Sequence, residues 1–235
     1  TCCKGDVVPP SSLRSRPPEG ELSPLGRPGG TEVALTRPGV AWLLLGLVLA
    51  GGALVGTQYP RTLLDWQPAL ASAEPWRAFS AAFVHLSTRH LLANLLGCVV
   101  VTAFGLIARV PWWIALAWLL AWPLGHVLLW FQPALQHYAG LSGVLHGGAA
   151  AAALYVALRG EGHERLIGWG VLAGVAVKLW REAPWRGPVQ AVAGWDIPIA
   201  PIAHATGVAA ALLCAGMALW VTRAWSHTAH GRDDE

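Results

Sequence analysis

The sequence predicts an all-α polytopic membrane protein, and three observations lead to this fold class. The chain has 235 residues, of which 54% are hydrophobic and only 12% are charged, whereas a soluble domain carries about 25% charged residues. Its apolar residues gather in long segments that approach the roughly 20 residues a helix needs to cross a bilayer. Its 14 tryptophans suit the aromatic belts at the two membrane surfaces.

Six apolar segments follow an amino-terminal tail, and each predicts one transmembrane helix. The tail, residues 1–38, is rich in Pro, Gly, Ser and Arg and has no sustained apolar period, which predicts disorder. The fifth segment is short and carries Lys178 at its end, whereas the others are long enough if tilted. A core over 39–223 and a short carboxyl-terminal tail over 224–235 are expected. The segments lie near residues 39–57, 88–107, 110–131, 141–158, 165–179 and 197–221.

The distribution of Lys and Arg favours a cytoplasmic location for both termini. In that orientation ten of the 16 basic residues lie inside, five of them in the amino-terminal tail, and six lie outside. The starts of the second, fourth and sixth segments and the end of the fifth then share the outer leaflet. Within the long first connection, 58–87, the stretch EPWRAFSAAFVHLS is amphipathic and is expected to lie in the interface. The first apolar run begins only at Gly39, so no signal peptide is expected.

Polar side chains inside membrane segments are costly, so they mark candidate functional residues. His90 and Asn94 in the second segment are four residues apart, share one helix face and can both donate hydrogen bonds. Two convergent donors suit an oxyanion pocket, and they equally suit polar contacts between helices. From this pair alone, a helix–helix contact is the simpler explanation.

Ser142 lies in the stretch YAGLSGVLHGG, after Gly140 and before Gly143. Gly140 permits a tight backbone entry with a positive φ, and Gly143 leaves space beside the hydroxyl. In the first turn of a helix, the serine lies near unpaired N–H groups that could hold a developing oxyanion. A helix N-cap or a small-residue packing site explains the serine alone more simply.

His204 lies one to two turns into the sixth segment, three residues before Gly207, which leaves a notch for a close neighbour. A neutral imidazole beside Ser142 could take its hydroxyl proton, whereas alone His204 is equally a packing residue. His146 shares a face with Ser142, although i to i+4 is an awkward approach to the hydroxyl. A metal site is the rival use of nine histidines, and the absence of an H-x-x-x-H pair and of nearby carboxylates counts against it.

Together these motifs resemble the rhomboid family of intramembrane serine proteases. The matching stretches are PWRAFSAAFVHLSTRHLLAN, ending at Asn94, GLSG at 140–143 and AHATG at 203–207, and they occur in the family's order. The resemblance covers roughly residues 39–221 and implies a six-transmembrane-helix rhomboid-like bundle. It implies that Ser142 is the nucleophile and His204 the general base, in a Ser–His dyad without an aspartate.

The resemblance also implies an oxyanion hole formed by His90, Asn94 and the backbone N–H of Ser142. The stretch GLSGVLHG and the compact core are similar to the rhombosortase branch, whose members cleave C-terminal Gly-Gly-type sorting tails of exported proteins. This implies a bacterial inner (cytoplasmic) membrane protein with protein substrates, no metal or other cofactor and no nucleic-acid partner, and it leaves the oligomeric state open. The supporting positions are Gly140, Gly143, Gly207 and His146.

Two departures from the family pattern and two other function classes remain. The second small notch residue, often Gly in the family, is Ala211, and the fifth segment has no tyrosine to stack on the histidine. A catalytically silent rhomboid-like protein that binds transmembrane segments is the first alternative, but such relatives lack the Ser or His of the dyad. A small transporter or channel is the second, and the almost uncharged segments count against it.

Overall fold

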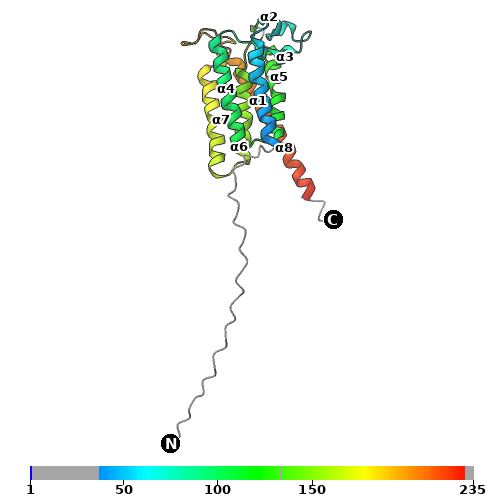
Figure 1. The fold of residues 1–235 in the computed structure, drawn as a ribbon, viewed down its shortest axis with the longest axis vertical. Helices are drawn as coiled ribbons and strands as arrows, with labels where there is room; N and C mark the ends of the chain where they lie inside the picture. Colours follow the sequence, from blue (N-terminus) through cyan, green and yellow to red (C-terminus); the bar gives the residue numbers. More distant parts are fainter. Residues whose placement is uncertain (2–36, 133, 231–235) are drawn as a thin grey trace, which may run out of the picture. The chain divides into compact units, whose positions relative to one another are not determined.

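The computed structural model describes residues 1, 37–132 and 134–230, and the regular structure in these ranges is helical (Figure 1). The expected disordered tail therefore lies almost entirely outside the described residues. The long helices are α1 (Arg37–Gly56), α4 (Thr88–Ile107), α5 (Trp112–Val127), α6 (Ser142–Arg159), α7 (Gly162–Glu182) and α8 (Pro201–His230). The short helices are α2 (Arg61–Leu64), η1 (Pro68–Leu70), α3 (Arg77–Ser80), η2 (Ala81–Phe83), η3 (Leu128–Phe131) and η4 (Pro184–Arg186).

Four helical stretches are long and apolar enough to cross a membrane, which supports the predicted class of polytopic membrane protein. They are Gly39–Gly56, Thr88–Ile107, Trp112–Phe131 and Pro201–Trp225. Helices α6 and α7 do not meet the same criterion. Helix α6 packs against α4, α5, α7 and α8 and is built largely of Gly and Ala, because the protein rather than lipid surrounds it. Helix α7 carries charged residues near both ends.

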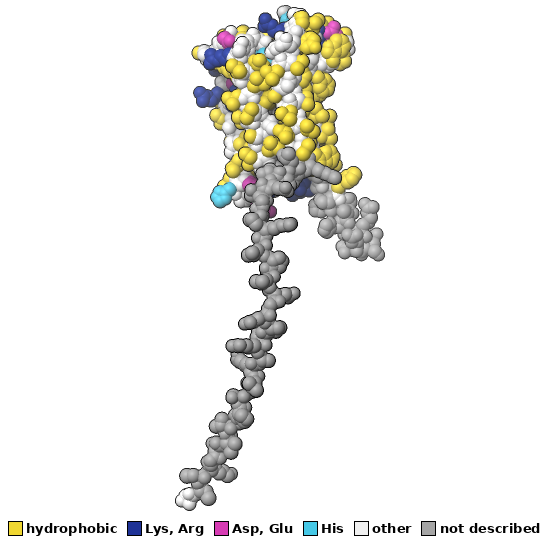
Figure 2. All heavy atoms as spheres, in the orientation of Figure 1, with side chains coloured by type: hydrophobic (Ala, Val, Ile, Leu, Met, Phe, Trp, Pro, Cys, Tyr) yellow, Lys and Arg dark blue, Asp and Glu magenta, His cyan; other side chains and the backbone are white. Residues whose placement is uncertain are grey.

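The long helices alternate in direction, so that one end of the bundle collects the starts of α4, α6 and α8 and the end of α7 (Figure 1). These are the four helix ends that the distribution of Lys and Arg predicts in one leaflet. The connections 57–87, 128–141 and 183–200 cover this end. Figure 2 shows hydrophobic side chains along the flank of the bundle and charged side chains gathered toward its ends. Leu96, Val99 and Ile107 of α4 are among the exposed apolar residues that suit contact with lipid.

The predicted segments match the helices closely, and the differences have a common physical reason. The fifth segment, predicted over 165–179, extends over all of α7 from Gly162 to Glu182. Helix α8 continues to His230, through residues expected to form the carboxyl-terminal tail. In both cases polar residues continue a helix beyond its apolar part, so apolarity marks the membrane stretch rather than the helix end. The stretch expected to be amphipathic, 74–87, forms only the short α3 and η2.

Helices α6 and α8 approach each other so closely that glycine is required at the contact. A Cβ atom on Gly207 would lie 2.1 Å from the carbonyl oxygen of Gly143, and one on Gly147 would lie 2.8 Å from that of Gly207. The notch expected at Gly207 is therefore present. Ala211 is fully buried against Gly147, so the alanine at the second notch position fits. This contact brings the start of α6 against the start of α8.

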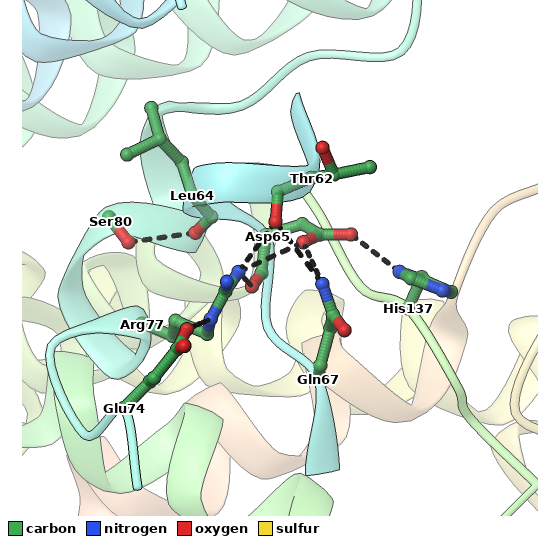
Figure 3. A network of polar contacts seen from close by, with 8 residues as sticks. All are labelled: Thr62, Leu64, Asp65, Gln67, Glu74, Arg77, Ser80 and His137. Atoms are coloured by element: carbon green, nitrogen blue, oxygen red, sulfur yellow. Dashed lines mark hydrogen bonds and ion pairs between the residues drawn. The ribbon is translucent and has the colours of Figure 1, made fainter. Parts of the chain in front are cut away.

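A buried network of polar contacts organises the long connection 57–87 (Figure 3). The Arg77 guanidinium donates to the carbonyl oxygens of Thr62 and Asp65, at 3.0 and 2.8 Å. It also pairs with the carboxylates of Asp65 and Glu74. The second Asp65 carboxylate oxygen lies 2.7 Å from Nδ1 of His137, in the segment that precedes α6. The network thus links the first connection to the approach to Ser142.

Backbone hydrogen bonds strengthen the same link. Trp66 and Tyr138 exchange two N–H···O bonds of 2.8 and 2.9 Å, and the Gly140 N–H donates to the Ala81 carbonyl oxygen at 3.0 Å. The Tyr138 hydroxyl donates to the Gly140 carbonyl oxygen at 3.0 Å. Burial raises the pKa of Tyr138 to about 12, so the hydroxyl keeps its proton. Hydrogen bonds to the first connection and within the segment itself therefore fix the residues that lead into Ser142.

Gly207→Ala is expected to destabilise the protein because its new Cβ atom meets a backbone oxygen that cannot rotate away. Overpacking of this kind costs about 1–3 kcal/mol of unfolding free energy. The matched control is Gly216→Ala on the same helix, where no described atom outside the local helix backbone lies within 4 Å of the new Cβ. Thermal unfolding in detergent measures both, and equal unfolding temperatures would contradict the close contact.

Arg77→Ala is expected to lower the free energy of unfolding by about 3–5 kcal/mol, because it leaves the buried Asp65 carboxylate without its guanidinium. Arg77→Lys is expected to recover only part of this loss, since an ammonium cannot reach the same fork of acceptors. The exposed Arg61, changed to Ala, is the control. Thermal unfolding of the three variants provides the comparison, and a similar effect at both arginines would refute the role of the network.

Candidate active site

The structure brings Ser142 and His204 into hydrogen-bond contact although 62 positions separate them in the sequence. Ser142 is the first residue of α6, and His204 lies in the first turn of α8. The serine Oγ and the imidazole Nε2 are 2.9 Å apart. Leu141 occupies the N-cap position of α6, and no side chain forms a capping bond there. The alternative explanation of Ser142 as a helix N-cap therefore does not hold.

Glu182 lies on the far side of the same imidazole, where its Oε2 is 2.7 Å from Nδ1 of His204. A carboxylate accepts hydrogen bonds, so Nδ1 carries the hydrogen and Nε2 is left to accept from the serine hydroxyl. The expectation that carboxylates are absent nearby was wrong. The sequence did not predict Glu182 as a site residue, because the predicted fifth segment ended at residue 179 and Glu182 then fell in a loop. Its spacing of four from Lys178 was a readable signal of a shared helix face.

The environment of Glu182 keeps its carboxyl group ionised. Burial by itself raises the pKa, but the hydrogen bonds that the carboxylate accepts from His204 and Lys178 outweigh it and lower the pKa to about 2. Lys178 pairs with the other carboxylate oxygen, Oε1. Each carboxylate oxygen of Glu182 therefore has its own partner: Oε2 pairs with the His204 imidazole and Oε1 with the Lys178 ammonium group.

His146 packs flat against His204. The two ring centroids are 4.2 Å apart and the ring planes differ by 18°. The Nδ1 atom of His146 lies 2.7 Å from the Ser142 carbonyl oxygen, which can only accept, so this nitrogen donates. The i to i+4 spacing thus reaches the backbone of Ser142 rather than its hydroxyl. A histidine of α6 supplies the stacked ring for which the fifth segment offers no tyrosine.

His90 faces the site across Gly140. The N–H of Leu86 donates to Nδ1 of His90 at 3.4 Å, so the hydrogen of the neutral ring lies on Nε2. Gly140 has φ +134°, and a Cβ atom there would lie 2.9 Å from this Nε2. Gly140 therefore has the positive φ that glycine permits, and the absence of a Cβ atom leaves room for the His90 imidazole.

Asn94 presents a buried donor without a partner. Its Nδ2 has no hydrogen-bond partner among the described residues, although the side chain is almost fully buried. An unsatisfied buried donor costs about 1–3 kcal/mol. A polar contact between helices, the alternative explanation from the sequence, would have used this group. Asn94 instead lines the same cavity as Ser142 and His204.

Ser142, His204, His90 and Asn94 all line one cavity of about 640 Å³. Its walls come from α4, α6, α7, the first turn of α8 and the connections that precede α4, α6 and α8. From His90 to Val100 it follows α4 for about 15 Å, at the helical rise of ~1.5 Å per residue. Small residues of three helices lie along it. They are Ala93, Gly97, Ala149 and Gly174.

Within the residues that the structure describes, no group of three or more His, Cys, Asp or Glu side chains could hold a metal ion. His85 lies beside His90, with ring centroids 5.0 Å apart, although the sequence spacing did not place them together. No protein-family model matches the chain, and no curated protein matches it either.

Proposed function

We propose that this protein is a rhomboid-type intramembrane serine endopeptidase with a six-helix rhomboid-like bundle. The observation that carries the proposal is the hydrogen bond between Ser142 and His204 at the end of a bundle of apolar helices. A serine hydroxyl bonded to an imidazole is the arrangement that activates the hydroxyl as a nucleophile. The unpaired amide of Asn94 in the same cavity adds a donor for the charge that this attack creates.

The proposed reaction is an acyl transfer. Ser142 Oγ attacks the scissile carbonyl while Nε2 of His204 takes the hydroxyl proton, and the same nitrogen returns it to the leaving amine. The carbonyl oxygen becomes an oxyanion, which Nδ2 of Asn94, Nε2–H of His90 and the backbone N–H of Ser142 stabilise. Water then hydrolyses the acyl-enzyme. The Nε2 lone pair of His204 and the Nε2–H of His90 follow from the hydrogen bonds of these side chains, and the Asn94 amide has no competing partner among the described residues.

The cavity supports a substrate that enters from the side of the bundle. Helices α4 and α7 both line it, and it extends along α4 into the apolar part of that helix. We propose that a transmembrane segment enters between α4 and α7 and unwinds near Ser142. The small residues Ala93, Gly97 and Gly174 favour small side chains next to the scissile bond. This suits the C-terminal Gly-Gly-type tails of exported proteins that rhombosortases cleave.

The proposal includes the orientation of the protein in the membrane. With both termini in the cytoplasm, which the basic residues favour, the cavity and Ser142 lie near the outer leaflet of a bacterial inner membrane. The alternative is a catalytically silent protein that binds transmembrane segments, because an apolar cavity along α4 also suits binding alone. The serine–histidine bond favours the enzyme, since a binding protein needs no activated hydroxyl.

A fluorophosphonate probe is expected to label the purified protein in detergent, and both Ser142→Ala and His204→Ala should abolish labelling. The probe reacts with serine hydroxyls that an adjacent base activates. Ser72→Ala and His163→Ala, which change exposed residues, are the matched controls and should label like the wild type. A folded wild type that does not label would favour the silent binding protein.

Asn94→Leu is expected to reduce turnover of a transmembrane substrate by about 10²–10³-fold, the usual cost of losing one oxyanion donor. Its unfolding temperature should stay the same or rise, because the amide nitrogen has no partner to lose. Turnover and thermal unfolding of the same preparation test both halves. A fall in stability with unchanged turnover would assign Asn94 to packing instead.

A further inference from the structure

We propose that Glu182 is a positioning residue that completes a Ser142–His204–Glu182 triad, and that Lys178 sets the orientation of its carboxylate. This inference rests on the proposed function and goes beyond the dyad that the rhomboid resemblance implies. Its basis is the line of contacts from Ser142 Oγ to His204 Nε2 at 2.9 Å and from His204 Nδ1 to Glu182 Oε2 at 2.7 Å.

The position of Glu182 is unfavourable for the helix that carries it. Glu182 is the last residue of α7, where the negative end of the helix dipole disfavours an acidic side chain. The neighbouring Lys178 and Arg181 have the charge that this helix end prefers. A carboxylate held at such a place, half-buried and bonded to an imidazole, is better explained by the imidazole than by the stability of α7.

The structure holds Glu182 against His204 through the connection between α7 and α8. Ala183, the C-cap of α7, has a left-handed conformation that turns the chain sharply after Glu182. The Gln190 side chain donates to the Ala183 carbonyl oxygen at 3.0 Å. Gln190 and Ile199 exchange two backbone bonds of 2.8 and 2.9 Å. Because α8 begins at Pro201, these bonds tie the end of α7 to the start of the helix that carries His204.

The carboxylate has two effects on the reaction. By accepting from Nδ1–H, it selects the tautomer in which Nε2 can take the serine proton. After that transfer it faces the imidazolium and stabilises its positive charge, while the proton on Nδ1 stays where it is. Glu182 therefore gains no proton during the cycle. The proton taken from Ser142 leaves on the amine of the product.

Lys178 makes the tautomer argument testable. An ammonium group can only donate hydrogen bonds, and Lys178 occupies Oε1 of Glu182. In Glu182→Gln the ammonium would keep the amide oxygen, so the amide NH₂ would face Nδ1 of His204. The hydrogen of the ring would then move to Nε2, which could no longer accept from Ser142. Glu182→Ala removes the carboxylate without forcing this tautomer.

The experiment compares second-order rates of fluorophosphonate labelling for the full chain in detergent, with the unfolding temperature of every variant. Glu182→Gln is expected to lower the rate by about 10²–10⁴-fold, and at least several-fold more than Glu182→Ala. Glu182→Asp, which keeps a carboxylate, should retain more activity than either. The double variant Lys178→Met/Glu182→Gln frees the amide to turn its oxygen toward Nδ1 and should recover at least tenfold over Glu182→Gln. Glu164→Gln, at an exposed position of the same helix, should match the wild type.

The outcomes separate this inference from the proposed function. If the wild type labels and Glu182→Gln is close to it, or faster than Glu182→Ala, the carboxylate only fills space and the inference is overturned. The inference is also overturned if Lys178→Met/Glu182→Gln labels no faster than Glu182→Gln. If the folded wild type labels no more than Ser142→Ala, the proposed function fails and the triad fails with it. Should Glu182→Gln not fold, the order of wild type, Glu182→Asp and Glu182→Ala still decides, since equal rates would refute the role.

Discussion

The close contact between α6 and α8 is the constraint on which the site depends. Ser142 begins α6 and His204 lies in the first turn of α8, and the two helix backbones approach closely where these side chains form their 2.9 Å bond. Gly143 and Gly207 allow this because neither carries a Cβ atom at the contact. Lipid tails are as apolar as the helices, so small residues and close packing rather than the hydrophobic effect hold such helices together. The glycines therefore serve the bundle and the chemistry at once.

The polar groups of this protein gather where they can satisfy one another away from lipid. Arg77 and Asp65 order the first connection, and the Trp66–Tyr138 bonds carry that order to the residues before Ser142. The hydrogen bonds of Gln190 to Ala183 and Ile199 likewise order the connection between α7 and α8. The nucleophile, its base and the carboxylate are thus positioned by loops that are themselves tied down. Among the described residues, Nδ2 of Asn94 has no hydrogen-bond partner, and Asn94 lines the cavity that a substrate would occupy.

Local patterns in the sequence predicted much of this arrangement. The apolar segments predicted the long helices within four residues except at the carboxyl end of α8, and Gly140 has the positive φ that a glycine permits. The apolar segments also predicted that α6 and α7 are membrane spans, but neither helix is among the four that are long and apolar enough. The neighbours of a helix, rather than its own composition, decide how apolar it must be. The stretch 74–87 was expected to be one amphipathic element, yet it folds as two short turns around the buried Arg77.

The sequence by itself determined which stretches are apolar, which polar residues lie inside them, and where glycine permits a tight turn or a close approach. These properties depend on residues within a few positions of one another, so periodicity and spacing reveal them. Only the tertiary structure decided that Glu182 meets His204, that the ring of His146 stacks on the same imidazole, and that the Asn94 amide is left unpaired. Glu182 is 22 positions from His204, and His146 is further still. Contacts between separate helices depend on how the helices pack, which no local pattern records.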